Sequence, residues 1–248
     1  YVAGRFQHTD YEREGLFANN TVYNDAKGKS GMKYFNTLST KAGLTYSING
    51  RHILQFNTGY FEEAQPLNNI FVNIRNSNSL LPSKLSPETQ ITADGSYIVR
   101  MPYVKARLTG YVTKFENATE KSYFFTQSRL GDESAGFLTQ TMMDVEKLHF
   151  GGELGVEVQL HPSWKASAVV SLNQYTYTND PILFQSSDKR LVSEPIVSHL
   201  KNYHAGQAPE QVYSLGLEYQ SQHYWWVSLT GNLFNNNYIG IAPSHRTE

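Results

Sequence analysis

The stretch Phe150-Gly-Gly-Glu-Leu-Gly-Val-Glu-Val-Gln-Leu160 alternates at every position between two kinds of side chain. Phe150, Leu154 and Val156 fall on one face with the other even-numbered residues, whereas Glu153 and Glu157 fall on the opposite face. At about 3.3 Å per residue and a tilt of roughly 40°, this stretch rises by slightly less than about 30 Å, the height of the apolar band of a bilayer. The pattern predicts a β-strand with one apolar face that is long enough to cross a membrane.

Neighbouring stretches repeat the alternation and are connected by short turns. Residues 164–172 alternate in the same way and follow directly after His161-Pro162-Ser163, which predicts an antiparallel hairpin. Three further hairpins are predicted, with tight turns near residues 50, 102 and 222. The strongest turn signal is Asn49-Gly50, because both residues tolerate positive φ. With residues 1–9 counted as a strand, the pattern predicts nine strands and no helix.

The connections between these hairpins are long and rich in Asn, Ser, Gly and Pro. They cover residues 11–33, 62–88, 118–143 and 179–209. A compact soluble domain rarely repeats connections longer than about 15 residues, whereas outer-membrane barrels have short turns on one side and long loops on the other. The predicted fold is therefore all-β, with antiparallel transmembrane β-barrel strands.

The composition excludes several other classes of protein. The 248 residues carry 21 basic and 22 acidic side chains, so a net charge of -1 gives no sign of nucleic-acid binding. Mean hydropathy is -0.47, and no apolar run approaches the ~20 residues of a membrane-spanning helix. No cysteine is present, which excludes disulfides and thiolate metal ligands within these residues.

Aromatic residues crowd the ends of the predicted strands. Amphipathic rings are favoured at a membrane interface. We expect a girdle near the tight turns from Tyr46, Tyr103, Trp164, Tyr219, Tyr224, Trp225 and Trp226. We expect a second girdle at the opposite strand ends from Tyr60, Tyr111, Phe115, Tyr175 and Tyr177.

Several segments also carry a family resemblance. They are Lys41–Arg51 with Gly59-Tyr60, Val104–Tyr111, Val212–Tyr219 with Tyr224-Trp-Trp-Val227, Phe234–Tyr238 and the loop Phe71–Arg75. In this order they resemble the barrel of TonB-dependent outer-membrane receptors, over nearly the whole chain. The resemblance implies a 22-stranded, multi-pass barrel in the outer membrane of a Gram-negative cell, with an N-terminal plug in its lumen. It also implies import of a scarce nutrient, such as a siderophore, cobalamin, a glycan or a peptide, driven by the TonB complex.

The sequence departs from this family pattern at its ends. It has no candidate plug, no TonB-contacting segment and no terminal aromatic residue, because it ends Ser244-His-Arg-Thr-Glu248. About nine strands cannot close the larger barrel, and open edges in hydrocarbon would leave backbone groups unsatisfied. We therefore expect residues 1–248 to be part of one barrel domain whose plug and terminal strands lie elsewhere. The expected partners are the bilayer, the protein's own plug and the TonB complex through the absent N-terminal part, with a surface lipoprotein as a further candidate.

Two groups of residues are candidate contact sites. The Asn-rich loop between residues 62 and 88 combines hydrogen-bonding groups with apolar ones, which suits a polar ligand with an apolar part. Its candidate ligand-binding residues are Asn68, Asn69, Phe71, Asn73, Arg75 and Asn76. The charged residues of the polar strand faces are candidate lumen- or plug-facing groups: Lys41, Arg100, Lys105, Arg107, Glu153, Glu157 and Lys165.

No catalytic, metal or cofactor site is predicted. The eight His are scattered, and His199 with His204 in one loop is a weak metal signal. No nucleophile elbow or phosphate-binding Gly-rich loop is present, so an enzyme is not expected. Two alternatives to the receptor stay open: a plugless outer-membrane barrel with a binding or enzymatic role, and a soluble β-rich binding domain.

Overall fold

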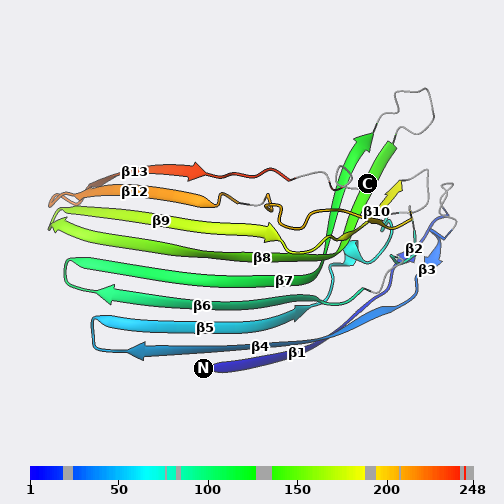
Figure 1. Cartoon of the computed structure of the whole chain (residues 1–248), viewed down its shortest axis with the longest axis horizontal. Helices are drawn as coiled ribbons and strands as arrows, with labels where there is room; N and C mark the ends of the chain where they lie inside the picture. The colour runs from blue at the N-terminus through cyan, green and yellow to red at the C-terminus, as the bar shows by residue number, and fades with distance from the viewer. Residues whose placement is uncertain are drawn as a thin grey trace.

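Nine long antiparallel strands lie side by side in one curved sheet, which we call the wall (Figure 1). The computed structural model describes residues 1–18, 25–75, 77–81, 85–126, 136–187, 194–206, 208–240 and 243. The order of the wall strands is β1-β4-β5-β6-β7-β8-β9-β12-β13. Their bounds are β1 Val2–Tyr11, β4 Lys33–Ser47, β5 His52–Glu63, β6 Glu88–Arg100, β7 Val104–Thr126, β8 Gly136–His161, β9 Trp164–Tyr177, β12 Gln211–Gln220 and β13 Trp226–Asn235. The predicted all-β antiparallel sheet of about nine strands is confirmed.

The shorter elements belong to the long connections between these strands. β2 (Glu14–Gly15) pairs with β3 (Gly28–Lys29), and β10 (Ile182–Ser187) pairs with both β8 and β11 (Ile196–Val197). The connection after β5 contains the single-turn 3₁₀ helix η1 (Leu67–Asn69), which the sequence pattern did not predict. In the part of the chain that the structure describes, no helix is long and apolar enough to span a membrane.

The four tight turns form where they were predicted, between β4 and β5, β6 and β7, β8 and β9, and β12 and β13. The Asn49-Gly50 turn nevertheless differs from the expected type, because neither residue has positive φ. The Asn49 side chain accepts hydrogen bonds from the backbone N–H groups of Arg51 and His52, at 2.9 and 3.0 Å. A side chain that caps its own turn replaces the primed two-residue turn that the dipeptide favours.

Strand register keeps the apolar side chains of the wall on one face. Leu44 lies opposite Phe56, Leu108 opposite Leu154, and Leu217 opposite Leu229. This face is left uncovered by the chain: Leu44, Leu215 and Leu229 expose 63%, 69% and 77% of their surface. The opposite face carries the polar residues, because a period of two sends alternate side chains to opposite sides.

The two predicted aromatic girdles have different outcomes. Near the tight turns, Trp164, Tyr219 and Trp225 form a contiguous row, with ring centroids 4.9 and 5.2 Å apart. The second girdle is wrong for four of its five members, since Tyr111, Phe115, Tyr175 and Tyr177 occupy odd positions that point to the polar face. The Tyr111 hydroxyl donates to Asn173 Oδ1 at 2.7 Å, and the His149 ring lies 4.9 Å from Phe115 and 4.8 Å from Tyr175. The distance of a residue from a strand end does not determine on which face of the sheet its ring lies.

The β7–β8 hairpin continues beyond the other strands of the wall, as Figure 1 shows. Residues 118–143 were expected to be a loop, but their described parts, up to Thr126 and from Gly136, extend the ladder. The register shifts between Phe115 and Glu120, and Asn117 and Asp144 have φ of 57° and 58°. Such a bulge bends a hairpin, so it redirects the extension away from the wall.

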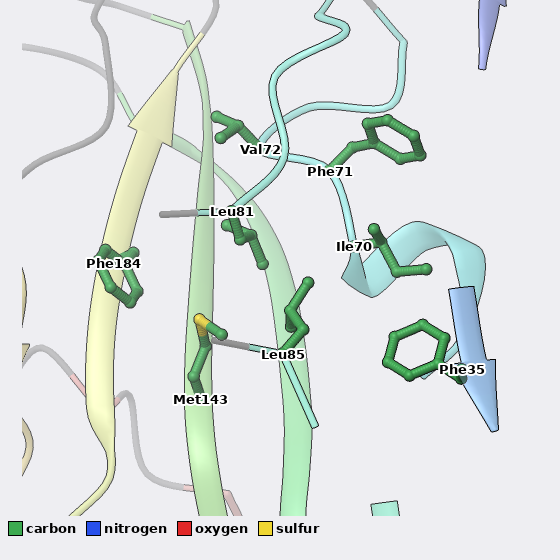
Figure 2. Close-up of a cluster of buried hydrophobic side chains, with 8 residues drawn as sticks. All are labelled: Phe35, Ile70, Phe71, Val72, Leu81, Leu85, Met143 and Phe184. Atoms are coloured by element: carbon green, nitrogen blue, oxygen red, sulfur yellow. The ribbon is translucent and has the colours of Figure 1, made fainter. Parts of the chain in front are cut away.

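The buried core lies at the end of the sheet opposite the tight turns. Figure 2 shows its main cluster, in which side chains from the β5–β6 connection pack between β4 and the β8–β10 pair. Ile70 and Phe71 have no exposed surface. The cluster consists of Phe35, Ile70, Phe71, Val72, Leu81, Leu85, Met143 and Phe184. A second cluster of Met142, Val145, Leu183 and Leu200 adjoins it along β8 and β10.

Candidate functional site

Two connections join at this end of the sheet to form a packed cap. We define the cap as the described residues of 12–32 and 64–87 together with the β7–β8 extension and β10. The Arg13 guanidinium donates to the carbonyl oxygens of Ile74 at 2.8 Å, Ala26 at 3.0 Å and Arg75 at 3.2 Å, and to Asn78 Oδ1. One arginine therefore satisfies backbone acceptors from both connections, which fixes them to each other.

Asp25 makes a second link between the two connections. Its carboxylate accepts hydrogen bonds from Ser77 Oγ at 3.1 Å and Ser79 Oγ at 2.7 Å. Asn78, between these serines, donates to the Gly28 carbonyl at 3.0 Å. Charge-assisted bonds of this kind are stronger than neutral ones, so the cap is ordered by polar links as well as by its apolar core.

A cavity of about 340 Å³ lies between the β5–β6 connection and the β7–β8 extension. This volume falls within the usual range of small-molecule sites. The polar side chains around it are two cations, three amide or hydroxyl groups and a phenol, and Val72 and Ile74 supply apolar surface. Its lining residues are Asn68, Val72, Asn73, Ile74, Arg75, Lys121, Tyr123 and Thr139.

Lys121 is the most constrained polar group of this cavity. Its ammonium donates to the carbonyl oxygens of Asn68 at 2.7 Å and Phe71 at 2.5 Å. Burial lowers the pKa of Lys121 to about 8, because the charged form loses its hydration. Within the described residues, two of the three ammonium donors have acceptors, which leaves one for a ligand.

The candidate ligand-binding residues of the β5–β6 connection are divided by the structure. Asn68, Asn73 and Arg75 line the cavity. Asn69 is turned to the Thr119 carbonyl, to which its amide donates at 2.6 Å, and Phe71 is fully buried in the core. Asn76 lies outside the described residues. Phe71 is therefore a core residue and does not line the cavity.

Five lining residues were not among the named candidates, and two of them, Val72 and Ile74, lie in the β5–β6 connection that contains the candidates. The other three, Lys121, Tyr123 and Thr139, belong to residues 118–143, which were expected to form a loop. A usable signal was present in Tyr123-Phe-Phe-Thr126 and Leu138-Thr-Gln-Thr141, which are rich in aromatic and β-branched residues and favour strands. Arg13 was also missed, and its role depends on contacts between residues more than 60 positions apart.

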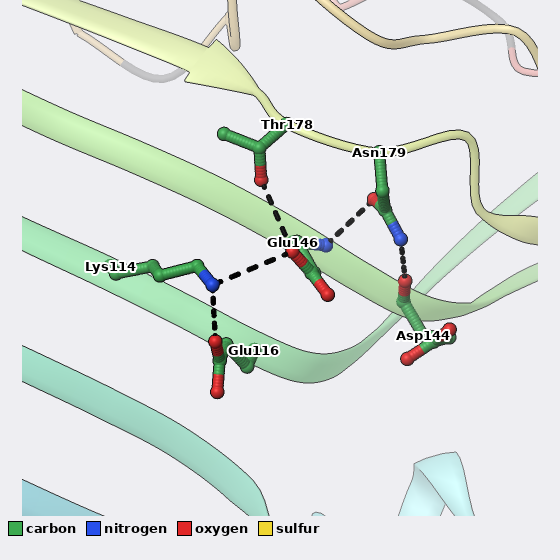
Figure 3. Close-up of polar contacts among 6 residues, drawn as sticks. All are labelled: Lys114, Glu116, Asp144, Glu146, Thr178 and Asn179. Atoms are coloured by element: carbon green, nitrogen blue, oxygen red, sulfur yellow. Dashed lines mark hydrogen bonds and ion pairs between the residues drawn. The ribbon is translucent and has the colours of Figure 1, made fainter.

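A charged cluster marks the boundary between wall and cap on the apolar face. Figure 3 shows the Lys114 ammonium between the carboxylates of Glu116 and Glu146, and the distance to Glu146 is 3.8 Å. Glu146 also accepts from Thr178 Oγ1 at 3.4 Å, and its N–H donates to Asn179 Oδ1 at 3.0 Å. On β7 the apolar face is formed up to this point by Val104, Ala106, Leu108 and Val112, so the apolar band ends at Lys114.

The charged residues predicted to face a lumen all lie on the polar face of the wall. Lys105 pairs with Glu157 at 3.1 Å and Lys165 with Glu218 at 3.3 Å. Arg107 donates to the hydroxyls of Ser96 and Thr109, and Glu153 accepts from Ser171 at 3.3 Å. Lys41 lies opposite Gly59, and Arg100 lies opposite Lys105. Their contact with a plug stays a prediction.

The histidines of the last long connection have carboxylate partners. His204 Nδ1 lies 2.7 Å from Glu210, and His199 Nδ1 lies 3.4 Å from Asp180. The His204 ring also stacks on Tyr238 at a centroid distance of 4.0 Å. Across the described ranges, no three His, Cys, Asp or Glu residues gather closely enough to hold one metal ion.

Comparisons with known proteins agree with this geometry. Residues 2–247 match the family model described as TonB dependent receptor-like, beta-barrel. Sixteen solved chains match the structure, among them one described as the copper transporter OprC, with a TM-score of 0.55 and 18% sequence identity. That match covers 89% of this chain and 30% of the transporter, and at this identity it shows the fold alone. None of the curated proteins matches the sequence.

Proposed function

We propose that this chain, which belongs to the TonB-dependent receptor β-barrel family, forms part of the wall and outer cap of a transporter that takes up a scarce nutrient. The predicted family resemblance is confirmed. Members of this family are outer-membrane receptors and transporters rather than enzymes. The chain covers 30% of the length of the matched transporter, so the plug, the closing strands and the TonB contact would come from parts of the protein outside these residues.

One observation carries the proposal: the two ends of the sheet are built for different surroundings. One end has four tight turns and exposed aromatic rings, and the other has a packed cap that contains a cavity. In the proposed orientation the apolar face of the wall contacts lipid and the tight turns face the periplasm. The cap then lies outside the cell, where its cavity meets the ligand first.

This orientation can be tested by cysteine labelling, because the 248 residues contain no cysteine. Lys27→Cys places a thiol on the exposed surface of the cap, and Tyr224→Cys places one at a tight turn where the side chain is fully exposed. In the full-length protein, with any other cysteines replaced, a membrane-impermeant maleimide should label position 27 in intact cells. It should label position 224 only after the outer membrane is permeabilised. The reverse pattern, or equal labelling of both positions in intact cells, would refute the orientation.

Energised uptake is tested by comparing cells with and without the full-length gene. Mass spectrometry of the growth medium should identify a compound whose depletion requires the gene and stops when a protonophore is added. Depletion that requires the gene but continues with the protonophore would favour the plugless barrel instead. If no compound depends on the gene across media limited for different nutrients, the transport proposal fails.

A further inference from the structure

Two lysines of the β7–β8 hairpin, one buried and one half-buried, differ in whether the protein supplies a counter-ion. Lys147 is 7% exposed, and its ammonium lies 2.6 Å from a carboxylate oxygen of Glu120. Lys121, on the adjoining strand, is half-buried and is held by two carbonyl oxygens. Among the described residues, no Asp or Glu forms an ion pair with Lys121. Burying a cation without an opposite charge is costly. An anion next to Lys121 would lower this cost, whereas Lys147 already has Glu120 as its counter-ion.

The position of Lys121 shows where the missing charge would sit. Lys121 lines the cavity together with Arg75, whose own guanidinium has no ion pair with any residue in the described ranges. No acidic residue is present among the described residues that line the cavity. Two cations around one cavity attract an anion, and the partial burial of Lys121 strengthens the attraction at its end of the cavity.

Arg75 is held in place through its backbone. Its N–H donates to Asn73 Oδ1 at 3.0 Å, and its carbonyl accepts from Arg13 Nη2 at 3.2 Å. The exposed guanidinium is therefore attached to a fixed segment of the cap. A guanidinium binds carboxylate and phosphate groups through two parallel hydrogen bonds, which a lysine cannot do.

The rest of the lining indicates what the anionic group is attached to. Val72, Ile74 and the ring of Tyr123 provide apolar surface, and Asn68, Asn73 and Thr139 provide neutral polar groups. This combination suits a small organic anion better than a fully hydrated inorganic ion.

We propose that the cavity binds a carboxylate or phosphate group carried on a partly apolar ligand, with Lys121 and Arg75 as its two cationic contacts. The inference rests on the proposed function in one respect, namely that the cap receives the transported ligand. It adds the chemical class of that ligand, which the family does not specify.

Anion binding next to Lys121 should depend on pH. An anion next to Lys121 favours the charged lysine, so binding raises the pKa of Lys121 from about 8. Binding above pH 8 must then take up a proton, and affinity must fall as pH rises through about 8. Lys147 and Lys114, on the same hairpin as Lys121, already have carboxylate partners, and the guanidinium of Arg13 is bonded to carbonyl oxygens of the two connections.

The test compares three probes of similar shape, benzoate, phenyl phosphate and neutral benzamide, bound to the full-length protein in a non-ionic detergent. Saturation-transfer NMR at pH 7 should show at least one anion binding about tenfold or more tightly than benzamide. Preference for benzoate would identify a carboxylate ligand, and preference for phenyl phosphate would identify a phosphate ligand. Equal binding of benzamide and both anions, or no binding of any probe, would overturn the proposal.

Variants test whether Lys121 itself, rather than the overall positive charge of the surface, binds the anion. Lys121→Met and Arg75→Gln should each weaken anion binding about tenfold, and Lys121→Met should also remove the loss of affinity near pH 8. Lys121→Arg keeps a charge that does not titrate, so it should retain binding without this pH dependence, provided that heat-modifiability on gels shows a folded barrel. Lys27→Met, which removes an exposed cation of the cap away from the cavity lining, is the matched control and should bind as the wild type does. Unchanged anion affinity in folded Lys121→Met would overturn the proposal.

These outcomes are independent of the transport experiment. If the cells deplete a neutral compound in a gene- and energy-dependent way, the transporter proposal stands and the anion inference fails. If the cap binds anions but no compound is taken up, the anion inference stands and the transport proposal fails.

Discussion

The wall and the cap place similar side chains in opposite environments. Leu215 and Leu229 of the wall expose 69% and 77% of their surface, whereas Ile70 and Phe71 of the cap expose none. Every fully buried aliphatic or aromatic side chain in the described residues belongs to the cap, to the connection after β9 or, in the case of Val145, to β8 at the bulge beside Ala118. The cap is thus stabilised by a buried apolar core, to which Phe35 of the wall strand β4 also contributes. The wall needs an external apolar solvent, which lipid supplies in the proposed setting.

Removal of a cap side chain should have the largest effect, because the core of the cap is small. Phe71→Ala should reduce the stability of the cap by about 3–5 kcal/mol, since it leaves a cavity where the ring was fully buried. Hydrogen exchange should become faster at the Leu81 amide, which bonds the Ile70 carbonyl at 2.9 Å, while amides in the wall stay protected. Phe56→Ala is the matched control in the wall, where the ring is 50% exposed, and it should leave the Leu81 amide unchanged. Equal loss of protection in both regions would show that wall and cap are one cooperative unit.

A charge on the apolar face of the wall should have the next largest effect. Leu215→Arg lies in the middle of β12 and should cost about 2–4 kcal/mol if this face contacts lipid. Ser214→Arg is the control, because the neighbouring residue points to the polar face, and its cost should be much smaller. Urea unfolding of the full-length protein in lipid vesicles measures both. If Leu215→Arg changed stability by no more than about 0.5 kcal/mol, as expected at a water-exposed site, the lipid-facing assignment would be wrong.

The smallest expected effect is a pH dependence in the connection after β9. The Lys201 N–H donates to Asp180 at 2.8 Å, and this hydrogen bond, with a smaller contribution from His199, lowers the pKa of Asp180. A lowered carboxyl pKa stabilises the folded form above the ordinary value of 3.8, and the stabilisation is lost as pH falls through the lowered pKa. Protection of the Lys201 amide from exchange should therefore decrease below about pH 4, after correction for the intrinsic rate. In Asp180→Asn this decrease should be absent, and its persistence there would assign the effect to another group.

The wall could be predicted in detail because its information is local. A period of two assigns each side chain to a face, and the turn residues set the strand ends, so the alternation alone places the seven charged candidates together on the polar face. The second aromatic girdle failed because the prediction used the distance of Tyr111 and Tyr175 from a strand end. The alternation itself placed both residues on the polar face.

The cap could be predicted only in part, because its contacts join segments that are far apart in the chain. The β5–β6 connection was recognised as a candidate site from its mixture of Asn, Arg and apolar residues, and three of its six named residues line the cavity. Lys121 could not be recognised in this way, since its importance comes from burial and from the lack of a carboxylate partner among the described residues. Phe71, which resembled a ligand contact in sequence, is a core residue.

The amino-acid sequence alone established the class of fold, the faces of the strands and the family, because alternation and turn chemistry act between near neighbours. The folded structure decided which side chains meet in the cap, which lysine has a counter-ion and where the cavity lies. These properties depend on burial and on contacts between residues far apart in the chain, such as the hydrogen bonds from Lys121 to the carbonyl oxygens of Asn68 and Phe71, 53 and 50 positions away. No local pattern encodes such distances, so only the tertiary structure could reveal them.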